Sequence, residues 1–300
     1  MRKTAILAAA AGLLASLSVR AEQPNLYDWM AVAPNVVAAR VTVDDQRYLE
    51  IEVTHGFRGT LAAGQKVKVD QKKANREREM NRPALRMEAG NDYLMLLKLE
   101  PPKKKDEPPP YEIVRGTEGV REIPAEGGVL WLEAAERFAS IQERKDERVL
   151  WRSLGDMLEE PNPILIETSL DMYLKFRRGE TEMLPSIRPL LSHPRADLRE
   201  KALSLIGLIL DRTGGAPAEE DAGLLAELIG RARRDDAVPV RVAATRALGS
   251  VKQRGTDEVL REISREDPEQ LVRYQAEVIL MTRRFDAAHG HEMRDKPGSD

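Results

Sequence analysis

Four stretches in the second half of the chain repeat one pattern of apolar residues. In each stretch the apolar residues fall at positions i, i+4, i+7 and i+8, which lie on one face of an α-helix. The stretches begin 32, 42 and 32 residues apart, which is the spacing of helical repeat arrays. One such unit cannot bury its apolar face alone, so neighbouring units are expected to stack. The four sets are Ile166, Leu170, Tyr173 and Leu174; Leu198, Ala202, Leu205 and Ile206; Val240, Ala244, Ala247 and Leu248; and Val272, Ala276, Ile279 and Leu280.

The same stretches resemble a known family of repeats. Residues 197–207 (DLREKALSLIG) and 240–249 (VRVAATRALG) are similar to the first helix of HEAT-like repeats of the PBS-lyase type, and residues 272–280 follow suit. The resemblance covers about residues 160–285 and implies a short α-solenoid of helix pairs. Members of this family bind many unrelated partners, so the resemblance implies an architecture and does not name a ligand.

The resemblance also implies a role for three arginines. In that family an arginine beside the first anchor joins a polar ladder between neighbouring repeats, and the residues at this position are Arg199, Arg241 and Arg273. The first repeat departs from the pattern, because Glu167 stands at the arginine position and Leu170 at the alanine position.

The first half of the chain has a different pattern, in which short apolar runs are separated by turn residues. Some runs alternate apolar and polar residues, as in Lys66–Asp70, whereas Tyr93–Leu97 is continuously apolar and predicts a strand that is buried on both faces. Five short strands in about ninety residues predict a small antiparallel β-barrel. The order of these segments resembles the OB-like barrels of some secreted bacterial proteins. The predicted strands are residues 36–43, 48–53, 66–69, 93–99 and 111–114.

The N-terminus predicts export. Arg2 and Lys3 precede a charge-free run, and small residues flank a cleavage point at Val19–Ala21, which is typical of a secretory signal peptide. The alternative is an ordinary N-terminal helix. The run is too short for a membrane span, and no later stretch approaches the required ~20 apolar residues. We therefore expect a periplasmic or secreted protein.

These patterns predict an α+β multidomain chain, in which a small OB-like antiparallel β-barrel precedes a short α-solenoid of HEAT-like helix pairs. The expected parts are a signal peptide at 1–21, the barrel at 22–128, the solenoid at 129–286 and a disordered tail at 287–300.

Composition narrows the possible ligands. The sequence has no cysteine, which excludes disulfides, thiolate metal sites and a cysteine nucleophile. Removal of the predicted signal peptide takes away three cations and moves the formal net charge from −3 to −6. A negative chain is a poor general binder of nucleic acid.

No recognisable catalytic, cofactor-binding or metal-binding motif occurs. His289 and His291 could bind a transition metal as a flexible pair of ligands. A disordered tail that binds no metal is the favoured interpretation. Asp235–Asp236 precedes a predicted helix, where acids favour the helix dipole. By the same logic, Arg283–Arg284 is expected to complement the C-terminal dipole of the helix that it follows.

One segment of the barrel carries a local excess of positive charge. Residues 66–86 hold eight cations and three acids, which could form an anion-binding lobe. The alternative is a solvated linker whose charges pair along a short helix. The candidate anion-binding residues are Lys72, Lys73, Arg76 and Arg78.

The sequence thus favours an exported, non-catalytic binding or assembly module whose helical repeats bind a partner protein. Two alternatives stay open. One is a binder of an anionic polymer or surface glycan that uses residues 66–86, and the other is an enzyme with an unrecognised carboxylate site in the barrel.

Overall fold

The chain forms two compact units, one ending at Arg144 and the other beginning at Lys145. The helix Gly128–Arg144 (α4) packs on α2 (Leu26–Met30) in the first unit. The contact boundary therefore lies one helix after the boundary expected from the change of hydrophobic period. The computed structural model describes residues 24–45, 48–70, 87–101, 110–214, 222–253 and 255–289.

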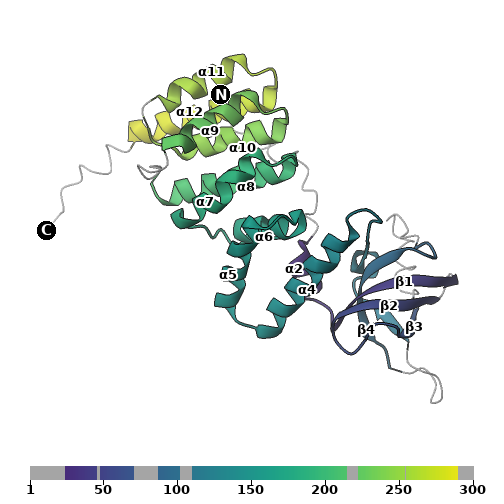
Figure 1. Ribbon diagram of the computed structural model, residues 1–300. Coiled ribbons are helices and arrows are strands. Elements are labelled where there is room, and N and C mark those ends of the chain that lie inside the picture. The colour runs from purple at the N-terminus through teal and green to yellow at the C-terminus, as the bar shows by residue number, and fades with distance from the viewer. Residues whose placement is uncertain are drawn as a thin grey trace. The chain divides into compact units, whose positions relative to one another are not determined.

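The first unit contains a closed barrel of five strands (Figure 1). The strands follow the order β1-β2-β3-β5-β4, and pairing of β4 with β1 closes the barrel. β3 and β5 run parallel, while the other pairs are antiparallel. β6 pairs with residues 93–95 of β4, on the edge that β4 also shares with β5. The strands are β1 Asn35–Asp45, β2 Tyr48–Arg58, β3 Lys66–Asp70, β4 Asp92–Leu99, β5 Tyr111–Ile113 and β6 Val120–Glu122.

Alternating side chains of these strands form the barrel core. Val37, Ala39 and Val41 of β1 pack with Ile51 and Val53 of β2 inside the barrel. In β4 the residues 93–97 are buried on both faces, as their continuous apolar run predicts. The five predicted runs correspond to β1–β5, and the sequence pattern did not reveal β6.

Arg58, at the end of β2, ties the N-terminal segment to the barrel unit. Its guanidinium donates to the carbonyl oxygens of Met30 and Ala33, and also to Gln142 Oε1 at 2.6 Å. Burial lowers the pKa of Arg58. The arginine thereby links β2 with α2 and α4, which explains why α4 belongs to this unit.

The second unit is built of helices that lie in successive layers (Figure 1). The helices α6, α8, α10 and α12 form one row that runs through these layers, and each packs on the next. The short helices α7 and η4 pack beside α8, α9 packs beside α10, and α11 packs beside α12. No helix in the described ranges is long and apolar enough to cross a membrane. The elements are α5 Glu147–Asp156, η2 Met157–Glu159, α6 Pro163–Lys175, η3 Thr181–Met183, α7 Leu184–Ile187, η4 Arg188–Ser192, α8 Ala196–Arg212, α9 Ala222–Arg234, α10 Val238–Ser250, α11 Thr256–Glu266 and α12 Gln270–His289.

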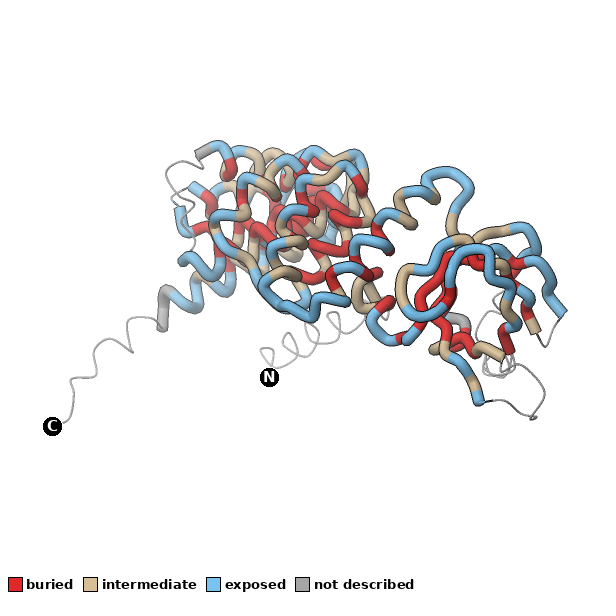
Figure 2. Tube along the Cα trace, turned by 60° about the horizontal axis from the view of Figure 1, so that its bottom comes forward, coloured by how far each residue is buried: buried red, intermediate tan, exposed pale blue. Residues whose placement is uncertain are grey.

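Most of the periodic apolar residues of the sequence are buried, and Figure 2 shows buried positions throughout the interior of the helical unit. The sets in α8 and α10 are completely buried, whereas Leu174 and Ile279, in the first and last sets, are partly exposed. Small residues bring α8 and α10 close together, because a Cβ atom on Gly207 would lie 3.2 Å from the Cα of Ala247. The buried stripes therefore fix the spacing of the helices.

Candidate functional site

Arg199 makes the most extensive buried ion pair of the helical unit. Its guanidinium binds both oxygens of Asp235, at 3.0 and 2.7 Å, and also Asp236 Oδ1 at 2.6 Å. A third nitrogen donates to the carbonyls of His193 and Pro194, in the turn before its own helix. The side chains of Arg199 and Asp235 are 8% and 0% exposed, so the pair is shielded from water.

Asp235 serves two neighbouring helices at once. Its Oδ1 accepts from the Ala237 N–H at 3.1 Å, at the start of α10, while it also pairs with Arg199 of α8. Burial raises the pKa of Asp235, but the hydrogen bonds from Arg199 and Ala237 outweigh burial and hold the pKa below its usual value. The carboxylate is thus charged and fixed in place.

Arg241 and Arg273 occupy the same place in the following repeats. Arg241 donates to the Asp235 carbonyl at 2.9 Å and pairs with Asp267 Oδ2 at 3.0 Å. Arg273 donates to the carbonyls of Asp267 and Pro268. Each arginine therefore binds the turn that precedes its own helix, and Arg199 and Arg241 also reach the acid of the next turn.

Glu167, which departs from the pattern, still takes part in contacts between repeats. It accepts from Arg195 Nη2 at 2.5 Å and from Lys201 Nζ at 3.2 Å. Lys201 also pairs with Asp171 of α6 at 2.8 Å. The charges are reversed here, since the acid lies in the first repeat and the cations in the second.

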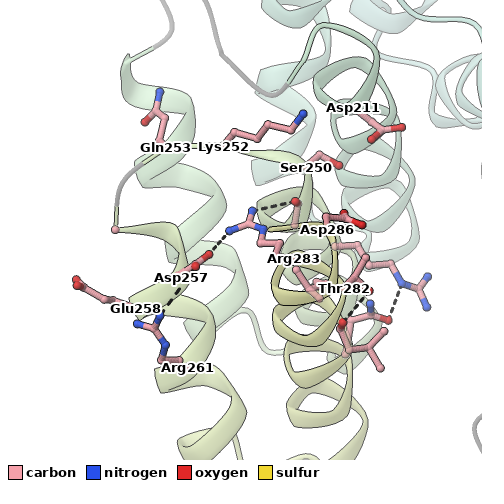
Figure 3. Close-up of a pocket in the computed structure, with 16 residues that line it drawn as sticks. Asp211, Ser250, Lys252, Gln253, Asp257, Glu258, Arg261, Thr282, Arg283 and Asp286 are labelled. Atoms are coloured by element: carbon pink, nitrogen blue, oxygen red, sulfur yellow. Dashed lines mark hydrogen bonds and ion pairs between the residues drawn. The ribbon is translucent and has the colours of Figure 1, made fainter. Parts of the chain in front are cut away.

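A groove lies at the C-terminal end of the helical unit, between α8, α10, α11, α12 and the segment that joins α10 to α11 (Figure 3). Its volume is about 910 Å³. Among the described residues, the wall carries the acids Asp211, Asp257, Glu258 and Asp286 and the bases Arg246, Lys252, Arg261 and Arg283.

Arg283 forms the fixed floor of this groove. It donates to the carbonyl oxygens of Leu248, Gly249 and Val251, at 2.9, 2.9 and 2.6 Å, where α10 ends. It also binds Asp257, which lies between Arg283 and Arg261 in Figure 3. The last carbonyls of a helix have no partner within the helix, and Arg283 supplies one.

The sequence predicted that Arg283 complements the dipole of the helix before it, and this prediction was wrong. This residue lies inside α12 and caps α10, rather than complementing the dipole of the helix that it follows. Sequence spacing alone gives no signal for a contact that spans 35 residues.

Four other charged side chains of the groove are exposed. They are Asp211, Lys252, Glu258 and Asp286, and within the described ranges none of them makes an ion pair. The described residues of the lining offer hydroxyl, amide and charged groups, and no histidine is among them. No group of three or more metal-ligating side chains occurs in the part of the chain that the structure describes. The arrangement offers charge and hydrogen bonds to a bound molecule.

The predicted anion-binding residues Lys72, Lys73, Arg76 and Arg78 lie outside the described residues, so the anion-binding lobe stays a prediction. Two cations of the same segment belong to β3. Lys66 lies 4.0 Å from Glu52, and the Lys68 ammonium lies 4.2 Å from the ring centre of Tyr48.

Two buried acids lie on neighbouring strands of the barrel. Asp70 and Glu112 are register partners in the parallel pair of β3 and β5. Glu112 is ion-paired with Lys98 at 3.0 Å. This ion pair gives the Glu112 carboxylate a structural role in the sheet.

The chain matches no protein-family model, and no curated protein matches it significantly. The functional inference therefore comes from the geometry of the groove and of the ladder.

Proposed function

We propose that this protein is an exported, non-catalytic binding module whose helical unit holds a partner protein in the groove between α10, α11 and α12. The helical unit is a short HEAT-like α-solenoid in this proposal, and the barrel is OB-like.

The repeated arginine contacts support the solenoid interpretation. Arg199, Arg241 and Arg273 follow the 42- and 32-residue spacing of the anchors, and each binds the turn before its helix. Recurrence of one arginine–carbonyl contact at the repeat interval is what stacking of equivalent units produces.

The order of the strands supports the OB-like interpretation. A five-stranded barrel of order 1-2-3-5-4, closed between the first and fourth strands, is a Greek-key arrangement, as OB folds are. The barrel is the less informative unit for function, because residues 71–86 lie outside its described part.

The groove carries the functional proposal. Its floor is held by Arg283, while Lys252 and Asp286 stay available at its wall. A surface that presents both signs of charge fits a protein segment with complementary charges, whereas a polyanion would be repelled by the acids. The rigid floor keeps the entropic cost of binding low.

The test uses groove variants in a capture experiment with the protein's own envelope fraction. Lys252→Glu combined with Asp286→Lys should remove the captured partner without changing the melting temperature. Arg265→Glu combined with Glu269→Lys makes the same exchange at exposed sites outside the groove lining, and this control should retain the partner. Equal capture by both double variants would rule out the groove as the binding site.

Export has a separate test. Cleavage after Ala21 should give a mature protein that begins at Glu22, as N-terminal sequencing would show. An intact Met1 in the native protein would contradict the proposed location.

A further inference from the structure

Three helices of the second unit end at the groove. α8 contributes Asp211 of its last turn, α10 contributes Gly249 and Ser250, and α12 contributes Asp286 of its last turn. The C-terminal end of a helix carries a partial negative charge, because its last carbonyl groups have no partner within the helix. The groove therefore collects the negative ends of α8, α10 and α12.

The end of α10 is compensated by a cation of the chain. Arg283 binds carbonyl oxygens at this end and also the carboxylate of Asp257, so its charge is already matched. Asp211 and Asp286 are exposed, and in the ranges that the structure describes neither makes an ion pair. At the ends of α8 and α12 the charge of an acid thus adds to the negative charge of the helix.

Helix stability does not explain these two acids. Asp257 and Glu258 lie in the first turn of α11, where an acid is favoured by the dipole. Asp211 and Asp286 lie in last turns, where the dipole disfavours an acid. Figure 3 shows Asp211 and Asp286 on one side of Arg283, and Asp257 and Glu258 on the other. One side of the groove therefore carries negative charge at a cost to its helices.

We propose that Asp211 and Asp286 bind a basic side chain, arginine or lysine, of the partner segment that the groove holds. This inference rests on the proposed function and names the chemistry that the groove recognises. A cation at this place would meet two carboxylates and the negative ends of two helices. Complementary charge of this kind selects one partner over others and speeds association. Arginine is the better fit of the two, because its planar fork can bind carboxylates through two hydrogen bonds.

The rest of the lining favours a protein side chain over a free metal ion. A calcium ion takes about six to eight oxygen ligands, and no group of three or more metal-ligating side chains occurs in the described part of the chain. Val278 and Ile279 add apolar surface, while Ser250 and Gln253 add hydrogen-bonding groups. Such a mixture suits the stem of a long side chain and the peptide groups next to it.

Fluorescence anisotropy with a labelled peptide of alternating glycine and arginine tests the proposal. The full-length purified protein should bind this peptide at about 50 mM salt with a dissociation constant of the order of 100 μM. The same peptide with citrulline in place of arginine should bind at least tenfold more weakly, because citrulline keeps the shape of arginine and lacks its charge.

A double variant locates the binding. Asp211→Asn combined with Asp286→Asn should weaken binding of the arginine peptide at least tenfold. Glu266→Gln combined with Glu269→Gln removes the same charge at exposed sites outside the groove lining, and this control should bind like the wild type.

Thermal unfolding of the same variants gives a second readout. Because Asp211 and Asp286 oppose the dipoles of their helices, the asparagine variant should melt about one to three degrees above the wild type. The control should melt close to the wild type, since Glu266 ends α11 and Glu269 precedes α12, so that the two effects oppose each other.

Three results would each overturn the proposal: equal binding of the arginine and citrulline peptides, equal binding by the asparagine variant and the wild type, or a lower melting temperature of the asparagine variant. Failure of the proposed function looks different. In that case the exchange of charge at Lys252 and Asp286 would leave capture of the envelope partner intact, whatever the arginine peptide does.

Discussion

The two units differ in how they handle buried polar groups. In the described residues, the buried arginines, Arg199 and Arg241, both belong to the helical unit. A closed barrel pairs the peptide groups of its strands with one another. Stacked helices leave unpaired peptide groups at every turn, and the arginines bind the carbonyls found there.

The ion pairs of the two units show the same contrast. In the barrel, Arg40 and Asp92 form a two-pronged pair at 3.0 and 2.9 Å, but their side chains are 54% and 34% exposed. The pair between Arg241 and Asp267 has similar geometry and is almost completely buried. Similar geometry therefore has different energetic weight, because water screens only the first pair.

The largest effect is expected in the buried interior of the helical unit. Ala244 is fully buried in α10, and Ala244→Glu should destabilise the helical unit by more than about 4 kcal/mol, because the new carboxylate has no partner. Thermal unfolding followed by circular dichroism measures this effect. Glu258→Ala, at an exposed site of α11, should change stability little. Near-equal melting of both variants would contradict the packed-repeat description.

Removing one member of an ion pair tests the contrast directly. Arg241→Met leaves Asp267 buried without its cation and should cost about 3–5 kcal/mol. Arg40→Met, at the exposed barrel pair, should cost about 0–1 kcal/mol. Urea denaturation gives both values. Equal losses would show that burial does not separate the two units.

Tyr173 gives a prediction at alkaline pH. Burial raises its pKa from 10.0 to about 12, and its hydroxyl donates to the Trp151 carbonyl at 2.9 Å. Because the folded state holds this proton more tightly, its stabilising effect is complete below pH 10 and is lost between pH 10 and 12. Tyrosinate absorbance should show a late step, and Tyr173→Phe should remove it. If the late absorbance step persisted in the variant, it would belong to another tyrosine.

The smallest effect concerns Glu200, a half-buried acid of α8. Burial raises its pKa above the ordinary 4.5, because the charged form is less well solvated in the folded state. Ionisation of Glu200 therefore lowers the free energy of unfolding as the pH rises above 4.5. Glu200→Gln should therefore be slightly more stable than the wild type at pH 7, by less than about 1 kcal/mol, and the gain should vanish in acid. Melting temperatures across this pH range measure it. A loss of stability at pH 7 would show that the carboxylate has a favourable contact.

Sequence reasoning found the parts that depend on local periodicity. Alternation and apolar runs located β1–β5, and the i, i+4, i+7 pattern located α6, α8, α10 and α12. Closure of β1 on β4 was not accessible in this way, because strand neighbours depend on contacts that are distant in the chain. β6 has only three residues, too few for a periodic signal.

The polar contacts divide in a similar way. The role of the ladder arginines was predicted from a resemblance to HEAT-like repeats, but the groups that accept their hydrogen bonds were not predicted. Asp235 was expected to favour a helix start, and it does accept from Ala237, yet it also binds Arg199 from the preceding repeat. The free charges of the groove come from four elements and have no common sequence pattern.

Closure of the barrel has a consequence for the rate of folding. The contact between Asn35 and Leu97 joins residues 62 apart, whereas Arg199 and Asp235 of the helical unit are 36 apart. Contacts between distant residues form late, because the loop must be closed before any pairing compensates for the lost entropy. The helices can add one repeat at a time as the chain lengthens. The first strand of the barrel, in contrast, must wait for the fourth before it has neighbours on both edges.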